Sequence, residues 1–150
     1  MVEFNWTAYD AALAELVAGA DLNSLANNAL VPIADAIEID NGTKRDYYIA
    51  VEVYLASVDL SGKTNPAVNL YMFEALNGTN YEDDWDNPAK LVDVVSVDPG
   101  SGAQVHRAVS RPILLPGPGK YKILPENKTG AAFAGTGNTI KFRAWSEESN

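Results

Sequence analysis

Apolar and polar residues alternate along most of the chain after Leu22, the spacing that places successive side chains on opposite faces of a β-strand. The strongest such run, Tyr47 to Leu55, is rich in aromatic and β-branched residues. Further strands are predicted at residues 68–74, 91–97, 105–115, 121–124 and 140–145, with weaker candidates at 21–26 and 33–39. Glycine-containing turns separate these runs, and no second helical pattern follows. The pattern predicts an all-β antiparallel sandwich, a jelly roll of about eight strands.

The segment before Leu22 has a different period. Thr7 is placed to cap a helix from Ala8 to Ala18, and Gly19 is placed to end it. Apolar residues three and four positions apart would form one face of this helix. We therefore expect an N-terminal helical arm over residues 1–20 and the jelly-roll sandwich over residues 21–150.

An isolated helix of this length is marginally stable in water, so its apolar face needs a surface to cover it. The arm residues expected to make such contacts are Phe4, Trp6, Leu13, Leu16 and Val17. Two arrangements are open. The arm packs on its own domain, or it reaches a neighbouring subunit.

Charge narrows the choice of partners. The net charge is −9, and Lys44-Arg45 is the one cluster of basic residues. Nucleic acids and anionic membrane surfaces attract positive fields, so neither is an expected partner. Four Asn-x-Ser/Thr triplets occur, at Asn5, Asn41, Asn77 and Asn127, and we interpret them as turn-forming sequences rather than glycosylation sites.

Catalytic chemistry has little support in the sequence. There is no cysteine, and the single histidine, His106, lies in a predicted strand, where we expect it at the surface or at a sheet edge. A nucleophile-elbow Gly-x-Ser-x-Gly motif and a phosphate-binding glycine loop are both missing. We expect a protein that is not an enzyme and needs no cofactor.

One acidic segment could bind a ligand. Residues 82–87 contain four carboxylates, among them Asp83, Asp84 and Asp86, but they lack the spacing of an EF-hand loop. A solvated loop is the default interpretation, and a Ca²⁺-binding loop is the alternative. Tyr81 and Trp85 could also join Tyr47-Tyr48 in a sugar-stacking platform, although aromatic residues in strands more often pack in the core.

Several stretches, taken together, resemble a family of small proteins encoded among the structural genes of tailed bacteriophages. The resemblance spans about residues 12–143 and is carried by the following segments: Leu22-Asn23-Ser24-Leu25-Ala26-Asn27, Ala36-Ile37-Glu38-Ile39-Asp40-Asn41-Gly42-Thr43, Tyr47 to Ser57, Leu70-Tyr71-Met72, Asn77-Gly78-Thr79-Asn80-Tyr81, Leu114 to Lys122, Asn127-Lys128-Thr129-Gly130 and Gly137 to Arg143.

The resemblance implies a virion-associated jelly-roll protein, most simply a head decoration (cement) protein on the outside of the capsid. Its expected partners are the major capsid protein and further copies of itself, as a homotrimer or another homo-oligomer. It would be made in the bacterial host cytoplasm and carried on the virion. The alternatives are a carbohydrate-binding module of a tail tip or fibre, and a tail or head-completion protein.

Overall fold

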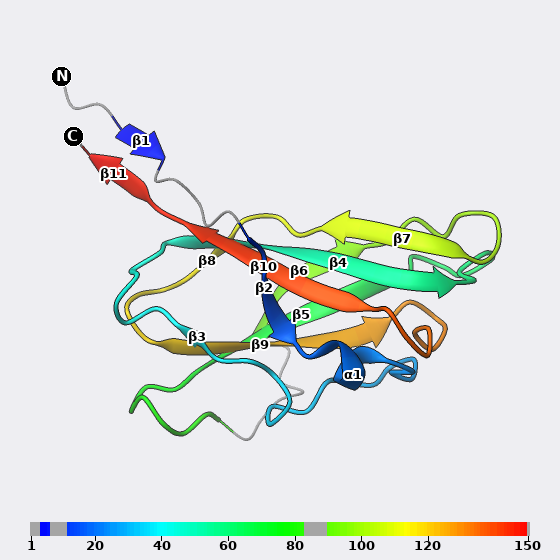
Figure 1. Ribbon diagram of the computed structural model, residues 1–150, viewed down its shortest axis with the longest axis horizontal. Coiled ribbons are helices and arrows are strands. Elements are labelled where there is room, and N and C mark those ends of the chain that lie inside the picture. The colour runs from blue at the N-terminus through cyan, green and yellow to red at the C-terminus, as the bar shows by residue number, and fades with distance from the viewer. Residues whose placement is uncertain (1–3, 7–11, 83–89, 150) are drawn as a thin grey trace.

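The computed structural model describes residues 4–6, 12–82 and 90–149. In these residues the chain forms two antiparallel sheets that lie face to face, a separate two-stranded ribbon and a single turn of helix (Figure 1). The prediction of an all-β sandwich is confirmed.

The first sheet contains five strands. In spatial order they are β2 (Ala14–Val17), β10 (Thr139–Trp145), β4 (Tyr48–Val58) and β7 (Gln104–Val109), with the short β8 (Ile113–Leu114) also paired to β4. The second sheet contains β3 (Ile39–Asp40), β9 (Lys120–Lys128), β5 (Ala67–Glu74) and β6 (Leu91–Ser96), in that order.

The core lies between the two sheets and follows from the alternation in the sequence. In β4, Ile49, Val51, Val53 and Leu55 are all at most 1% exposed, while the residues between them face outward. The second sheet contributes inward-facing side chains such as those of β5 and β9 to the same cluster. Burying each large aliphatic side chain contributes about 1.5–3 kcal/mol, so this apolar layer is the main source of stability.

The predicted N-terminal helix is wrong where the structure describes it. Residues 14–17 form β2, which pairs with β10, and residues 7–11 lie outside the described part of the chain. A register shift beside Ile140 lets Leu16 and Val17, which are neighbours in sequence, both point into the core. That doublet, together with Leu13, produces the helix-like spacing. Sheet pairing therefore overrides a local preference that was marginal.

The observed helix, α1, covers only Gly19–Leu22. It begins at the glycine that was expected to end a helix. Since β2 belongs to the first sheet, the sandwich begins by residue 14 rather than at residue 21.

Three strand predictions need correction. Residues 21–26 do not form a strand. The strand predicted at 33–39 is reduced to the two residues Ile39–Asp40. The predicted strand 105–115 is split into β7 and β8 at Ser110, Arg111 and Pro112, where proline has no N–H to continue a ladder.

The ribbon consists of β1 (Phe4–Trp6) and β11 (Glu147–Ser149), which pair antiparallel. It extends away from one end of the sandwich (Figure 1). Its base is next to the first residues of β4, since Trp145 pairs with Tyr48.

Buried asparagines hold the loops to the sandwich. Asn127, which is 0% exposed, donates from Nδ2 to the carbonyls of Leu25 and Ala131, both at 2.8 Å. Its Oδ1 accepts hydrogen bonds from the backbone N–H and the hydroxyl of Thr129. Asn41 is likewise buried and bonded to loop backbone, whereas Asn77 is exposed and caps its own turn. In these three triplets the turn interpretation agrees with the contacts.

Replacing Asn127 with Ala should lower the free energy of unfolding by about 2–4 kcal/mol, because it leaves buried loop donors and acceptors without partners. Asn77→Ala is the matched control, since that asparagine accepts similar turn hydrogen bonds at the surface and should cost less than about 1 kcal/mol. Urea denaturation of both variants measures the difference. Equal losses would show that burial of the Asn127 amide has no special role.

Candidate functional site

The predicted contact residues of the arm are placed in two different environments. Leu16 and Val17 are 0% and 1% exposed in the core of their own sandwich, so they offer no surface to a neighbouring subunit. Leu13, just before β2, is half-buried. The expectation that Leu16 and Val17 contact a neighbour is therefore wrong, and the physical reason is that β2 is an integral strand of the first sheet.

Phe4 and Trp6 lie in β1 and so belong to the terminal ribbon, not to the sandwich. Among the described residues, β1 pairs with β11 and with no other strand. The ribbon extends beyond one end of the sandwich (Figure 1). Of the predicted arm, this segment stays a candidate for contacts with a partner.

The acidic loop is largely outside the described residues, including Asp83, Asp84, Trp85 and Asp86. Its predicted roles in Ca²⁺ or glycan binding stay predictions. In the rest of the chain, as far as it is described, no group of three or more His, Asp or Glu side chains is arranged to hold a metal ion.

Tyr81, at the start of that loop, is described and packs on the outer face of the second sheet. Its ring lies in the cluster around Phe73 and Leu124, and its hydroxyl donates to Glu38 Oε2 at 2.8 Å. Burial, followed by the hydrogen bond to the Glu38 carboxylate, raises the pKa of Tyr81 well above its ordinary value. Lys122 Nζ lies 5.3 Å from the centre of the ring. This tyrosine secures the loop to the sandwich.

Tyr48 cannot share a sugar-binding platform with Tyr81. Side chains alternate between the two faces of β4, and Ile49, the residue after Tyr48, points into the core. Tyr48 therefore faces outward from the first sheet, on the side of the sandwich opposite to Tyr81. There it stacks on Trp145 with ring centres 5.9 Å apart. The four-aromatic platform considered from the sequence is therefore not assembled as proposed.

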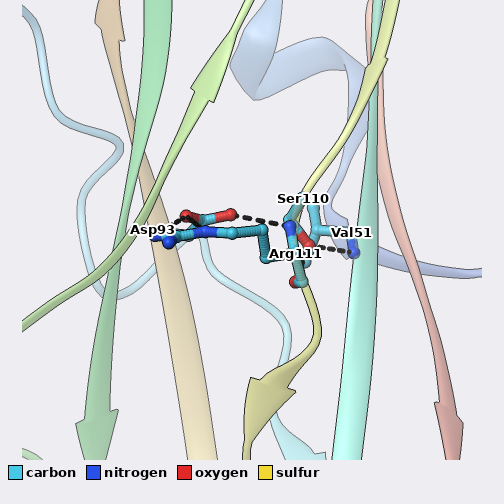
Figure 2. A network of polar contacts seen from close by, with 4 residues as sticks. All are labelled: Val51, Asp93, Ser110 and Arg111. Atoms are coloured by element: carbon cyan, nitrogen blue, oxygen red, sulfur yellow. Dashed lines mark hydrogen bonds and ion pairs between the residues drawn. The ribbon is translucent and has the colours of Figure 1, made fainter.

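A polar network that the sequence analysis missed ties the two sheets together at the β6–β7 rim (Figure 2). Asp93 of β6 is 5% exposed and accepts hydrogen bonds from the Arg111 backbone N–H at 2.9 Å and from its guanidinium at 2.8 and 3.1 Å. The adjacent Ser110 hydroxyl accepts from Val51 N and donates to Arg111 O. An aspartate in the middle of an apolar run, Leu91 to Val97, is the signal that could have revealed it.

The charge state of Asp93 follows from these contacts. Burial favours the neutral carboxyl, but the hydrogen bonds from the Arg111 side chain and backbone outweigh that effect and hold the pKa of Asp93 below its ordinary value. The Arg111 side chain is 83% exposed, so the guanidinium covers the carboxylate from the solvent side.

His106 is also placed differently from its prediction. It lies in the edge strand β7, as expected, but its side chain points inward and is only 4% exposed. Nε2 donates to the carbonyl of Val58 at 3.1 Å. The imidazole is therefore buried with the core and hydrogen-bonded to backbone, which is the environment of a histidine that supports the fold.

The outer edge of β7 and β8 is unusually apolar for a surface. Val105, Val109 and Leu114 are 52%, 61% and 57% exposed and point outward from the first sheet. The sequence signal was available, because these residues alternate with the inward-facing His106, Ala108 and Ile113. The alternation does not identify the buried face of β7, because each face combines apolar and polar residues: Val105, Arg107 and Val109 alternate with His106 and Ala108.

None of the helices among the described residues has the length and apolar character required to cross a membrane. No protein-family model, curated protein or solved structure matches this chain.

Replacing Asp93 with Asn should lower the free energy of unfolding by about 1–3 kcal/mol at pH 7, because charge-assisted hydrogen bonds to Arg111 are lost. The folded-state pKa is depressed, so this stabilisation is complete above the unfolded pKa of about 4 and disappears as pH falls through the folded value. Chemical denaturation of both proteins between pH 7 and pH 2 should show the difference narrowing below about pH 4.

The exposed Asp98 provides the control. Asp98→Asn removes a surface carboxylate that accepts one turn hydrogen bond, and it should change stability by less than about 1 kcal/mol. A wild-type advantage over Asp93→Asn that stays constant down to pH 2 would contradict the assigned role of the charge.

Proposed function

We propose that the protein is a non-enzymatic virion component of a tailed bacteriophage, a head decoration (cement) protein that binds the outside of the capsid and bridges its subunits. The observation that carries the proposal is the terminal ribbon. β1 and β11 lie outside the sandwich and pair with each other beyond one end of it, as expected for an attachment element (Figure 1).

The strand order supports the jelly-roll part of the proposal. When β2, β3, β4, β5, β6, β7, β9 and β10 are counted as strands one to eight, the two sheets have the orders one-eight-three-six and two-seven-four-five. This order is the one expected for a jelly roll, a double sheet built from two Greek keys, and it supports that proposal. Jelly rolls occur in viral capsid proteins and also in lectin domains, so fold alone does not select between these functions.

The net charge also suits a decoration protein. A net charge of −9 keeps a protein soluble at the high local concentration found on a particle surface. Contacts that are individually weak become strong when several linked copies bind neighbouring capsid subunits at once. The proposed partners are thus the major capsid protein and further copies of this chain, and the proposed location is the exterior of the capsid.

The main alternative is a carbohydrate-binding module on a tail tip or fibre. The observation that favours it is the stacked Tyr48–Trp145 pair on the outer face of the first sheet. A tail or head-completion protein of the same fold is a third proposal. Copy number separates them, because a decoration protein covers the head in many copies whereas a tail or neck component is present in a handful.

Removing the ribbon, by deleting residues 1–6 and 147–150, should leave the sandwich folded and abolish binding to capsids. The deletion keeps β2 with its two core residues, Leu16 and Val17. The measurement is co-sedimentation of the shortened chain with purified phage heads that lack the protein, with thermal unfolding followed in parallel.

A deletion of residues 1–18 is the contrasting variant. It also removes β2 and should lower stability by at least about 4 kcal/mol, since two buried aliphatic side chains and a strand pairing are lost. Capsid occupancy by the ribbon-deleted chain at the wild-type level would rule out the ribbon as the attachment element. Glycan binding by the intact chain without any binding to heads would favour the carbohydrate-binding alternative.

A further inference from the structure

Two Asn-Gly sequences occur in the chain, Asn41-Gly42 and Asn77-Gly78, and each is followed by a threonine. In such a pair the backbone nitrogen of the glycine can attack the side-chain amide carbon of the asparagine, because glycine has no side chain to hinder the approach. The two sites share this sequence, so a difference in their reactivity is set by the fold. They form an internal comparison of one sequence in two environments.

Asn41 is buried and hydrogen-bonded at both ends of its amide. It is 2% exposed, and its Nδ2 donates to the carbonyls of Asp46 and Gly117 at 2.8 and 3.1 Å. Its Oδ1 accepts a hydrogen bond from Asp46 N at 2.8 Å. The nitrogen that would have to leave is thus fixed by two acceptors, away from water. Reaction at Asn41 therefore requires a local opening that breaks these contacts, and such openings are rarely populated.

Asn77 lies in an exposed turn after β5, in a loop that projects from the sandwich (Figure 1). Its Oδ1 accepts hydrogen bonds from the backbone N–H groups of Thr79 and Asn80 at 2.9 and 2.8 Å. Within the described part of the chain its Nδ2 has no hydrogen-bond partner. When a nucleophile adds to the amide carbon, negative charge develops on Oδ1, where these two donors already point, and donors placed in this way favour the addition.

The two glycines also differ in the space around them. Gly78 has a φ of +73°, and a Cβ added to it would meet no heavy atom within 4 Å. Its N–H makes a single turn hydrogen bond, to Ala75 O at 2.8 Å. The Cβ position of Gly42 is instead 3.1 Å from Asp40 Oδ1, which also accepts from Gly42 N at 3.0 Å. The backbone at Gly78 can therefore change conformation without disturbing packed neighbours.

We infer that Asn77 is a site of spontaneous deamidation and that the fold protects Asn41 from the same reaction. A bond forms between Gly78 N and Asn77 Cγ, the proton of Gly78 N is lost to solvent, and Asn77 Nδ2 takes up a proton and leaves as ammonia. The product is a five-membered succinimide. Solvent water then adds to one of its two carbonyls and opens the ring to isoaspartate or aspartate.

The reaction changes the charge and the backbone of this turn. Either product carries a new carboxylate, which adds one negative charge to a chain of net charge −9, close in sequence to the acidic residues 82–87. Isoaspartate also routes the main chain through the former side chain and lengthens it by one methylene. The hydrogen bonds of Oδ1 to Thr79 and Asn80 are then lost in their present geometry. This modification site is independent of the proposed function.

The test follows both asparagines in one sample. Folded full-length protein is incubated in a mildly alkaline buffer made with heavy-oxygen water, and a parallel sample is unfolded in the same buffer with urea. Peptide mass spectrometry with electron-transfer fragmentation measures heavy-oxygen incorporation and the share of isoaspartate at each asparagine. Gly78→Ala blocks the approach of the attacking nitrogen. Gly62→Ala is the matched control, since Gly62 also has a positive φ, +71°, and open space around its Cβ position.

In the folded protein Asn77 should be converted at least roughly tenfold faster than Asn41, because Asn41 reacts only from locally opened states. In urea the two rates should become similar, since the fold no longer separates the sites. Gly78→Ala should slow conversion of Asn77 several-fold in both samples, whereas Gly62→Ala should leave it unchanged.

Equal rates at the two asparagines in the folded protein, faster conversion of Asn41, or no conversion of Asn77 would each overturn the inference. A rate at Asn77 that Gly78→Ala does not lower would also overturn it, because the amide would then be hydrolysed directly by water without attack by the glycine nitrogen.

Discussion

Exclusion of water from the space between two facing sheets is the constraint on which the rest of this structure depends. A single antiparallel sheet would leave the aliphatic side chains of β4 exposed on one face, and a second sheet at about 10 Å covers them. Because strands alternate, the same packing fixes which residues face outward. The exposed positions of Val109 and Tyr48 are thus set by the burial of their neighbours. Surface chemistry in this protein is a consequence of its core.

Burial also decides where polar groups can be used. Asn127 donates to the carbonyl of Leu25, and Asn138 donates to the side chain of Asn23, so both amides tie the segment after α1 to distant parts of the chain. These side chains hold the connection against the sandwich without regular secondary structure. Asp93 likewise connects the two sheets, through an ion pair in which the guanidinium of Arg111 covers its carboxylate. Such groups add specificity because a shifted loop or strand would leave them unpaired in an apolar environment.

Much of the sandwich could be predicted from the sequence, and much of the site could not. Runs such as Tyr47 to Leu55 have a strand period, high β-propensity and flanking turns, so three signals agree. The prediction of an N-terminal helix was wrong because Leu13, Leu16 and Val17 have helical spacing, while the pairing of β2 with β10 depends on residues more than a hundred positions away. Asp93 is recognisable as an aspartate within an apolar run, but its partner Arg111 could not be identified, since an ion pair between two sheets leaves no periodic signal. Where both faces of a strand combine apolar and polar residues, as in β7, the sequence does not identify the exposed side.

The pairing of the first strand with the last has a consequence for how this chain can change. Phe4 to Trp6 and Glu147 to Ser149 are far apart in the sequence but pair residue by residue. An insertion or a deletion within either segment therefore leaves residues of the other segment without their partners. The two segments form one structural unit, and neither can change without affecting the other.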